Sequence, residues 1–199
     1  MKIKEAVFTG SSSNYQQCPQ DKRPELAFIG RSNVGKSSLI NMLLVHKGLA
    51  KISNKPGKTQ LINHFLVNQA CYLVDLPGYG WAKASKLAKA QWSKMVRDYL
   101  LHRANLACLF VLIDSRHKPQ KIDLAFIDWL GTHKVPFAIV MTKADKVSKQ
   151  QVQVHRHELE QVLHKDWEVL PHFLITSSHG QVGRLEMLGF IETMCHEAQ

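Results

Sequence analysis

From Glu25 onward, short apolar runs alternate with segments in which apolar residues recur every three or four positions. The apolar runs predict strands at 25–29, 61–67, 70–74, 106–113, 136–141 and 172–176. The periodic segments predict helices near 36–45, 85–101, 120–132, 148–164 and 183–196. This alternation predicts an α/β fold, with a mostly parallel sheet of about six strands and helices on both faces.

The predicted strands 61–67 and 70–74 are separated by only about two residues. A parallel crossover needs a dozen or more residues, so this pair must form an antiparallel hairpin. We therefore expect one antiparallel edge strand on the parallel sheet. Residues 1–24 are mostly polar and predict an N-terminal extension with at most one short strand at Ala6–Thr9, followed by a single domain over residues 25–199.

Composition indicates the class of protein and the compartment in which we expect it. The chain has 199 residues, of which 45% are apolar and 21% charged, as in ordinary globular proteins. No apolar stretch approaches the ~20 residues of a membrane span, and the N-terminus lacks a signal-peptide core. The four cysteines form no C-x-x-C pair, and Cys71 and Cys108 fall in predicted strands, which favours buried, reduced thiols. We expect a cytoplasmic monomer with no membrane partner.

Positive charge is concentrated in one third of the chain. Of the net charge of +10, residues 31–97 carry eleven Lys or Arg and one acid, whereas residues 98–199 carry eleven basic and twelve acidic residues. Such a field attracts polyanions, of which nucleic acid is the common one. The alternative is that the positive charge only neutralises the phosphates of a bound nucleotide. Direct contact with those phosphates needs only Lys36, so this alternative explains a minority of the excess charge.

Residues 30–38 fit the phosphate-loop pattern G-x-x-x-x-G-K-S, between a predicted strand and a predicted helix. In such a loop, backbone N–H groups and the helix N-terminus surround phosphate oxygens. Lys36 is expected to reach the β- and γ-phosphates, and the Ser37 hydroxyl to bind Mg²⁺. The predicted binding residues here are Gly30, Arg31, Ser32, Asn33, Val34, Gly35, Lys36, Ser37 and Ser38.

Two further elements predict contacts with Mg²⁺ and the γ-phosphate. Asp75 begins a D-x-x-G element after the strand 70–74, and Thr59 lies in the long loop 46–60. Asp75 and Thr59 are expected to join Ser37 around Mg²⁺, and the N–H of Gly78 to sense the γ-phosphate. Lys36, Thr59 and Gly78 are the predicted catalytic residues. The binding residues predicted in these elements are Gly57, Lys58, Thr59, Gln60, Leu61, Asp75, Leu76, Pro77 and Gly78.

Two motifs, which follow the predicted strands 136–141 and 172–176, predict which nucleotide base is bound. Asp145 ends a T-K-x-D motif, where its carboxylate would accept two hydrogen bonds from guanine N1 and the exocyclic amine. Adenine offers no such donor pair, which favours GTP and GDP over ATP. Backbone N–H groups after the strand 172–176 would bind guanine O6. The predicted guanine-site residues are Thr142, Lys143, Ala144, Asp145, Thr176, Ser177 and Ser178.

These motifs, in this order, resemble the EngB family (also called YihA or YsxC) of bacterial ribosome-assembly GTPases, in the TrmE-Era-EngA-EngB-Septin-like superfamily. The resemblance is carried by residues 28–41, 55–60, 75–80 and 142–145, and covers about residues 6–195. It implies a P-loop NTPase fold of the Ras-like G-domain type, slow GTP hydrolysis with Mg²⁺, association with the large ribosomal subunit, and a link to cell division and septation.

Seven lysines flank the two predicted switch segments and predict a basic surface for ribosomal RNA. They are Lys47, Lys51, Lys55, Lys58, Lys83, Lys86 and Lys89. Two alternatives stay open: a kinase-like nucleotide-processing enzyme, which would need an acceptor pocket, and an RNA-binding protein with a vestigial nucleotide site.

Three positions refine the chemistry. Tyr79 stands where Ras-like proteins have the glutamine that orients the attacking water. A phenol can bind water but does not copy a carboxamide, so we predict weak intrinsic turnover. Related GTPases coordinate K⁺ through an asparagine at the position of Asn33, so we hypothesise K⁺ stimulation; the alternative is a loop-stabilising asparagine. Thr142 replaces the more usual asparagine of this motif and predicts only micromolar affinity.

Overall fold

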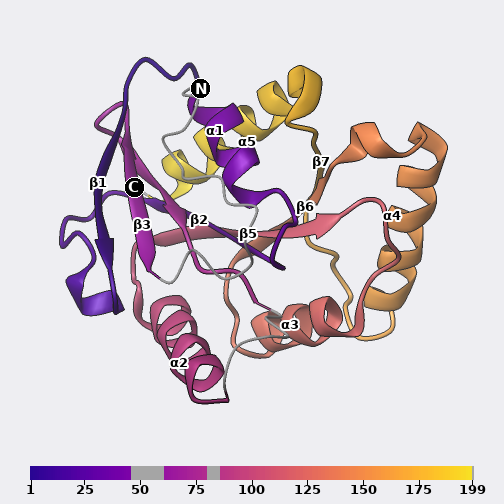
Figure 1. Cartoon of the computed structure of the whole chain (residues 1–199), viewed down its shortest axis with the longest axis horizontal. Helices are drawn as coiled ribbons and strands as arrows, with labels where there is room; N and C mark the ends of the chain where they lie inside the picture. Colours follow the sequence, from indigo (N-terminus) through magenta and orange to yellow (C-terminus); the bar gives the residue numbers. More distant parts are fainter. Residues whose placement is uncertain (46–60, 80–85, 199) are drawn as a thin grey trace.

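The computed structural model describes residues 1–45, 61–79 and 86–198. Figure 1 shows a twisted central sheet with helices packed above and below it. The helices are α1 (Lys36–Leu44), α2 (Lys86–His102), α3 (Lys121–Thr132), α4 (Lys149–Leu163) and α5 (Arg184–Glu197). The strands are β1 (Ala6–Ser12), β2 (Glu25–Gly30), β3 (Ile62–Val67), β4 (Cys71–Asp75), β5 (Leu106–Asp114), β6 (Phe137–Thr142) and β7 (Phe173–Ile175). All eleven helices and strands predicted from the periodicity are present.

The sheet has seven strands in the order β1-β3-β4-β2-β5-β6-β7. The β3–β4 pair is antiparallel, as its short connection predicts, and the pairings among β4, β2, β5, β6 and β7 are parallel. The short strand expected at residues 6–9 extends to Ser12 and pairs antiparallel with β3, with a register shift between Phe8 and Gly10. The antiparallel part therefore lies at one edge, as predicted, but β1 adds a strand outside β3.

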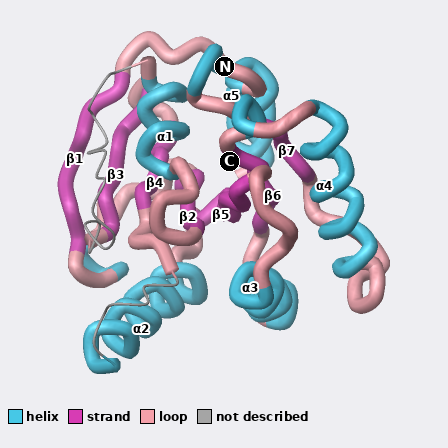
Figure 2. Tube along the Cα trace, turned by 45° about the vertical axis from the view of Figure 1, so that its right-hand side comes forward, coloured by secondary structure: helices cyan, strands magenta, loops and turns pink. Residues whose placement is uncertain are grey.

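Helices cover both faces of the sheet (Figures 1 and 2), and an apolar cluster fills each interface. Helices α1 and α5 pack on one face, where Leu39, Leu43 and Ile191 are fully or almost fully buried. Helices α2, α3 and α4 pack on the other face, where Tyr99 and Ile127 are fully buried. Burial of apolar surface on both faces supplies the main driving force for folding, and explains why the central strands are continuous apolar runs.

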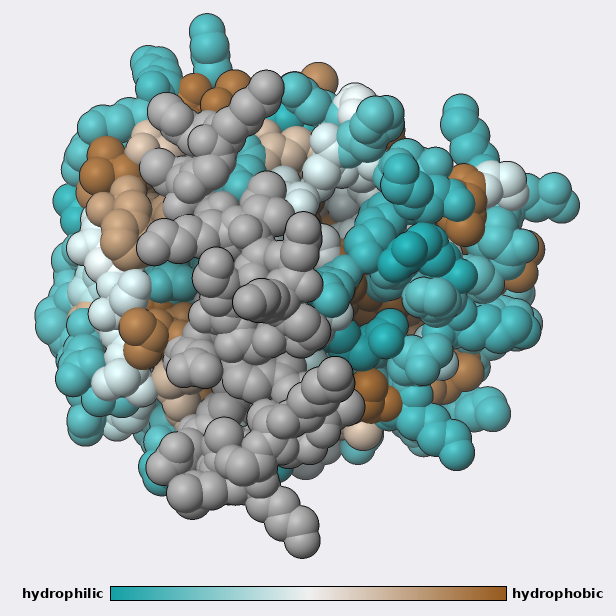
Figure 3. Space-filling view, viewed as in Figure 1, coloured by the Kyte–Doolittle hydropathy of each residue, from teal (hydrophilic) through white to brown (hydrophobic). Residues whose placement is uncertain are grey.

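Helix α4 shows how local sequence sets an element's start and its outer face. The Ser148 side chain caps the helix by accepting a hydrogen bond from the Gln151 N–H at 3.1 Å. Leu159 and Leu163 are buried against the sheet, while most exposed residues of the helix, apart from Val154 and Val162, are polar. Hydrophilic residues accordingly dominate the visible surface around α4 (Figure 3).

The parallel strands bring functional loops to one edge. Strand β2 ends at Gly30, β4 at Asp75, β5 at Asp114 and β6 at Thr142, and these strands are neighbours in the sheet. Ligands bind at this carboxyl edge in open α/β sheets. The predicted motifs that follow β2, β4, β6 and β7 therefore share one side of the molecule.

The cysteine prediction is confirmed, because Cys71, Cys108 and the two other cysteines are buried and free. None of the helices in the described residues has the length and apolar character needed to cross a membrane.

Candidate functional site

The loop between β2 and α1 has the tight geometry that its glycines predict. Gly35 caps α1 with φ of 108°, a backbone conformation that favours glycine. At Gly30, a Cβ atom would lie 2.8 Å from Val34 Cγ1 and 2.9 Å from Leu112 Cβ, so only glycine fits. Leu39 N–H donates to Gly35 O at 2.9 Å as the helix begins. The N–H groups of the first turn of α1 are thus directed toward the carboxyl edge, as a phosphate site requires.

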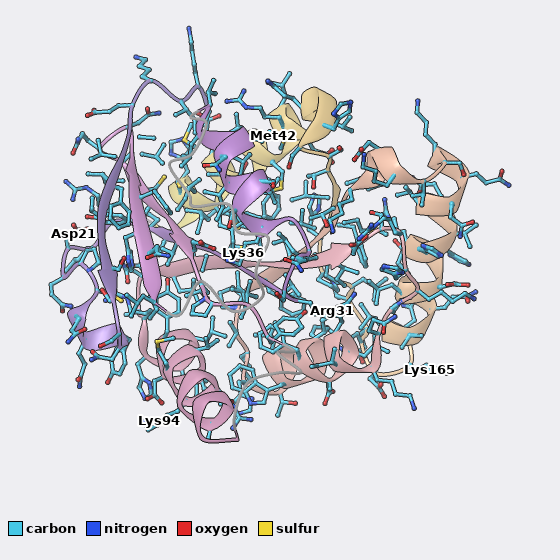
Figure 4. The ribbon with its side chains drawn as sticks, viewed as in Figure 1. Asp21, Arg31, Lys36, Met42, Lys94 and Lys165 are labelled. Atoms are coloured by element: carbon cyan, nitrogen blue, oxygen red, sulfur yellow. The ribbon has the colours of Figure 1, made fainter. Side chains whose placement is uncertain are left out.

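Lys36 and Asp75 form a buried pair at the centre of this edge. Lys36 is the first residue of α1, and Asp75 is the last residue of β4. Their side chains are 9% and 4% exposed, and Lys36 Nζ donates to Asp75 Oδ1. Figure 4 labels Lys36 above the sheet edge. The structure therefore brings the predicted phosphate-binding ammonium and the predicted Mg²⁺-binding carboxylate into direct contact.

The D-x-x-G loop is joined to the phosphate loop through its backbone. Leu76 N–H donates to Phe28 O at 3.0 Å, and Tyr79 N–H donates to Gly30 O at 3.0 Å. A Cβ atom on Gly78 would lie 2.6 Å from Gly30 O, so glycine is required by close approach. A movement of Gly78 toward Gly30 must therefore be accommodated by the phosphate loop.

Tyr79 does not present its phenol for a water molecule. The residue is 4% exposed, and its hydroxyl donates to Asp123 Oδ1 at 2.9 Å. The possibility that the phenol binds the attacking water is therefore wrong for this conformation, because the hydroxyl is already bonded to a buried carboxylate. Sequence spacing could not indicate this partner, which lies 44 residues away in α3.

The T-K-x-D motif is bonded directly to the phosphate loop. Thr142 Oγ1 donates to Val34 O at 2.6 Å, so the threonine binds the backbone of the phosphate loop directly. Lys143 Nζ donates to Asn33 O at 2.5 Å, with Lys143 in the left-handed region at φ of 58°. These contacts fix the distance between the phosphate and base ends of the site.

Asp145 is oriented by the loop after β7. Ser177 Oγ donates to Asp145 Oδ1 at 2.5 Å, and Ala144 N–H donates to Thr176 O at 3.2 Å. The hydrogen bond from Ser177 lowers the pKa of Asp145, so its carboxylate is ionised at neutral pH. Two segments predicted to contact guanine, residues 142–145 and 176–178, are therefore in direct contact with each other.

Asp114 was missed by motif analysis. It ends β5 between the two motif-bearing strands, and its Oδ2 accepts from Lys143 Nζ at 2.9 Å and from Arg116 Nη2 at 2.8 Å. Burial raises the pKa of Asp114, but these hydrogen bonds outweigh burial and hold it well below its usual range. The available signal was an apolar run that ends in an acid at the same sheet edge.

Some predicted residues cannot be compared with the structure. Gly57, Lys58, Thr59 and Gln60 lie outside the described residues, whereas Leu61 lies just before β3 and is 40% exposed. Of the seven lysines of the predicted basic surface, Lys86 and Lys89 belong to α2. The other five are outside the described ranges and are Lys47, Lys51, Lys55, Lys58 and Lys83.

Comparison with known proteins decides the family. Residues 25–143 match the family model described as "50S ribosome-binding GTPase". A "Probable GTP-binding protein EngB" from Bacteroides thetaiotaomicron is 51% identical over 197 residues, covering 99% of this chain and 98% of that protein. The chain belongs to the EngB family of GTP-binding proteins. A relative of the same name from Flavobacterium psychrophilum is 54% identical, over 96% of this chain and 94% of that protein.

Solved structures agree on the fold. A crystal structure of a probable GTP-binding protein engB superposes with a TM-score of 0.70 at 21% identity, covering 87% of this chain and 99% of that one. Era from Aquifex aeolicus, solved with GDP and AlF4⁻, gives a TM-score of 0.66 at 23% identity, over 88% of this chain and 57% of that one. The fold is that of a Ras-like P-loop GTPase, and the family assignment makes this chain a GTP-hydrolysing enzyme with GTP and GDP as ligands.

Proposed function

We propose that this GTPase is a switch in the assembly of the large ribosomal subunit, acting in the cytoplasm and needed for normal cell division and septation. One observation carries the switch: the backbone contact between Gly78 and Gly30 couples the D-x-x-G loop to the phosphate loop. A γ-phosphate that draws on the Gly78 N–H would therefore act on the D-x-x-G loop and the phosphate loop together.

Nucleotide contacts follow from the site geometry. Lys36 would bind the β- and γ-phosphates, and the N–H groups that begin α1 would surround the phosphate oxygens. Asp145, ionised and oriented by Ser177, would accept hydrogen bonds from guanine N1 and the exocyclic amine. The Ser177 N–H already donates to Val182 O at 3.1 Å, so the predicted contact with guanine O6 falls to the Ser178 N–H.

The residues at the carboxyl edge suit Mg²⁺. The Asp75 carboxylate is a buried, hard oxygen donor beside Lys36, and the Ser37 hydroxyl follows Lys36 in α1. Ser37 and Asp75, with Thr59 from the loop, would hold the ion. Bound Mg²⁺ supplies positive charge to the β- and γ-phosphates.

Asn33 carries the K⁺ hypothesis. Its φ is 63°, and its carbonyl accepts from Lys143, which keeps the residue at the tip of the phosphate loop. A K⁺ ion bound there would add positive charge beside the phosphates and stimulate hydrolysis. The expected result is faster turnover in K⁺ than in Na⁺ with large ribosomal subunits present; equal turnover would contradict it.

The ribosomal partner is supported by charge and by relatives. The excess of basic residues between positions 31 and 97 fits an RNA surface, and the matched family model is described as binding the 50S ribosome. Era, which shares the fold, has been solved with MgGDPNP and a segment of 16S ribosomal RNA. For this chain, the proposed partner is the large subunit, through the basic surface beside the switches.

Co-sedimentation tests this function. The full chain is centrifuged with purified large subunits in a GTP analogue, in GDP and without nucleotide, at two salt concentrations, with small subunits as the control. We expect binding to large subunits to be strongest with the GTP analogue and to fall steeply with salt, because each phosphate contact releases counterions. Binding that is indifferent to both nucleotide and salt would refute the proposal.

A further inference from the structure

A buried carboxylate on α3 joins two nucleotide loops. Asp123 is fully buried in the first turn of the helix. Its Oδ1 accepts the hydrogen bond from the Tyr79 hydroxyl at 2.9 Å, and its Oδ2 lies 3.2 Å from Arg31 Nε. Figure 4 labels Arg31 between Lys36 and α3. The two partners therefore come from the phosphate loop and from the residue that follows the D-x-x-G glycine.

A helix-stabilising role explains only part of this arrangement. A negative charge in the first turn of a helix interacts favourably with the helix dipole, and Asp123 occupies such a position. An exposed carboxylate would serve equally well, whereas burying one costs several kcal/mol unless it is paired and hydrogen-bonded. The contacts with Tyr79 and Arg31 offset only part of this cost, because burial outweighs them and raises the pKa of the Asp123 carboxyl. A carboxylate kept here at a net cost needs an explanation of its own.

Helix α3 holds Tyr79 at two points. Besides the bond to Asp123, the Tyr79 ring lies 4.9 Å from the ring of Phe126, centroid to centroid, one turn further along α3. On its backbone side, Tyr79 N–H is bonded to Gly30 O, and Arg31 and Tyr79 are paired as a β-bridge. The peptide between Gly78 and Tyr79 is thus fixed from both the phosphate loop and α3.

We propose that Asp123 is a positioning residue for γ-phosphate recognition. By anchoring Tyr79 and Arg31 together, it holds Gly78 against Gly30 and sets where the Gly78 N–H points. This inference rests on the proposed contact between Gly78 and the γ-phosphate. It assigns to α3 a direct part in distinguishing GTP from GDP, because GDP lacks the phosphate that Gly78 would contact.

The test compares affinities for a non-hydrolysable GTP analogue and for GDP in the full-length protein. Asp123→Asn keeps the shape but removes the charge that faces Arg31, and Tyr79→Phe keeps the ring but removes the hydroxyl. Asp128→Asn, an exposed position on the same helix, is the matched control. Calorimetry gives the two dissociation constants, and thermal unfolding in the absence of nucleotide reports on structural damage.

We expect each of the first two variants to lose about tenfold in affinity for the GTP analogue while GDP affinity changes by less than about twofold. The losses in the double variant should add up to less than the sum of the two single losses, because both changes act on the one network centred on Asp123. Equal losses for both nucleotides, or unchanged affinity for the analogue, would overturn the positioning role. If the wild-type chain bound neither nucleotide, the proposed site itself would be refuted, and this inference with it.

Discussion

Two buried ion pairs lie at the carboxyl and amino edges of the sheet and have very different surroundings. At the carboxyl edge, Lys36 and Asp75 are 9% and 4% exposed. At the amino edge, Arg103 and Glu25 are 8% and 0% exposed. Burial is therefore nearly the same in the two pairs, and it does not by itself distinguish a functional pair from a structural one.

The number of partners distinguishes them. Both Glu25 oxygens accept from the Arg103 guanidinium, and Oε2 also accepts from the Tyr99 hydroxyl at 2.6 Å. His64 Nε2 lies 3.3 Å from Oε1, and Arg103 donates further to Pro19 O at 2.9 Å. Lys36 has three donors, and within the described part of the chain Asp75 is the acceptor that it contacts. Among the described residues, the amino-edge pair is saturated, while Lys36 has donors left for phosphate.

Residue type follows the same division. A guanidinium has a rigid fork that suits two carboxylate oxygens, so Arg103 locks Glu25 in one geometry. A lysine ammonium is a compact charge on a flexible stem, and it can turn from Asp75 toward a phosphate. We infer that the Glu25 cluster stabilises the fold and that the Lys36 pair serves ligand binding.

The largest expected effect is on stability, from Glu25→Gln. This change leaves the buried Arg103 charge uncompensated, and we expect the free energy of unfolding to fall by about 3–5 kcal/mol. Nucleotide affinity should not change, because Glu25 lies at the opposite end of β2 from Gly30, roughly 16 Å away. Urea denaturation measures the free energy of unfolding, and calorimetric titration with GDP measures the nucleotide affinity. Glu158→Gln, which breaks a pair on the surface, is the control and should change the free energy of unfolding by at most about 1 kcal/mol.

The pH dependence gives an independent check on Glu25. Burial raises its pKa, but the contacts with His64, Arg103 and Tyr99 outweigh burial and lower the pKa from 4.5 to about 2. Because the folded value lies below the unfolded one, this stabilisation is complete above about pH 5 and is lost as the pH falls toward 2. It amounts to about 3 kcal/mol. A wild-type stability profile as flat in this range as that of Glu25→Gln would contradict a structural role.

The next effect concerns nucleotide binding, from Lys36→Gln. The amide keeps a donor for Asp75 but removes the charge, so we expect affinity to fall about 100-fold, and more for a GTP analogue than for GDP. Because Lys36→Gln leaves the buried Asp75 charge without its partner, the melting temperature without nucleotide should fall as well, and affinity is measured at a temperature at which the variant is folded. Lys94→Ala, an exposed lysine on α2 paired with Asp98, is the control and should leave affinity unchanged. A large loss of stability with intact affinity would reverse the division between the two pairs.

Sequence reasoning recovered most of the nucleotide edge, because local spacing encodes it. Glycine and lysine positions predict the phosphate loop, and the ends of apolar runs predict that Asp75 and Thr142 reach the same edge as the phosphate loop. The elements were predictable since each depends on neighbours within a few residues.

The missed features are contacts between distant segments. Glu25 meets Arg103 at a separation of 78 residues, and Asp123 meets Tyr79 at a separation of 44. In the sequence, each acid looks like an ordinary surface charge, and nothing nearby indicates its partner. Only the packing of α2 and α3 on the sheet buries each acid beside that partner. Polar partners inside the protein therefore needed the structure, whereas the loops facing the nucleotide did not.

The smallest predicted effect belongs to Asp114, which shares features of both pairs. Like Glu25 it has both oxygens occupied, but one of its partners is the guanine-site lysine, Lys143. We expect Asp114→Asn to weaken binding of GTP analogue and GDP alike by about tenfold, because Lys143 loses a charged acceptor but keeps its bond to Asn33. Calorimetry with both nucleotides and a melting curve check this. If affinity is unchanged and stability is lowered, Asp114 has a structural role like that of Glu25, although it lies at the nucleotide edge of the sheet.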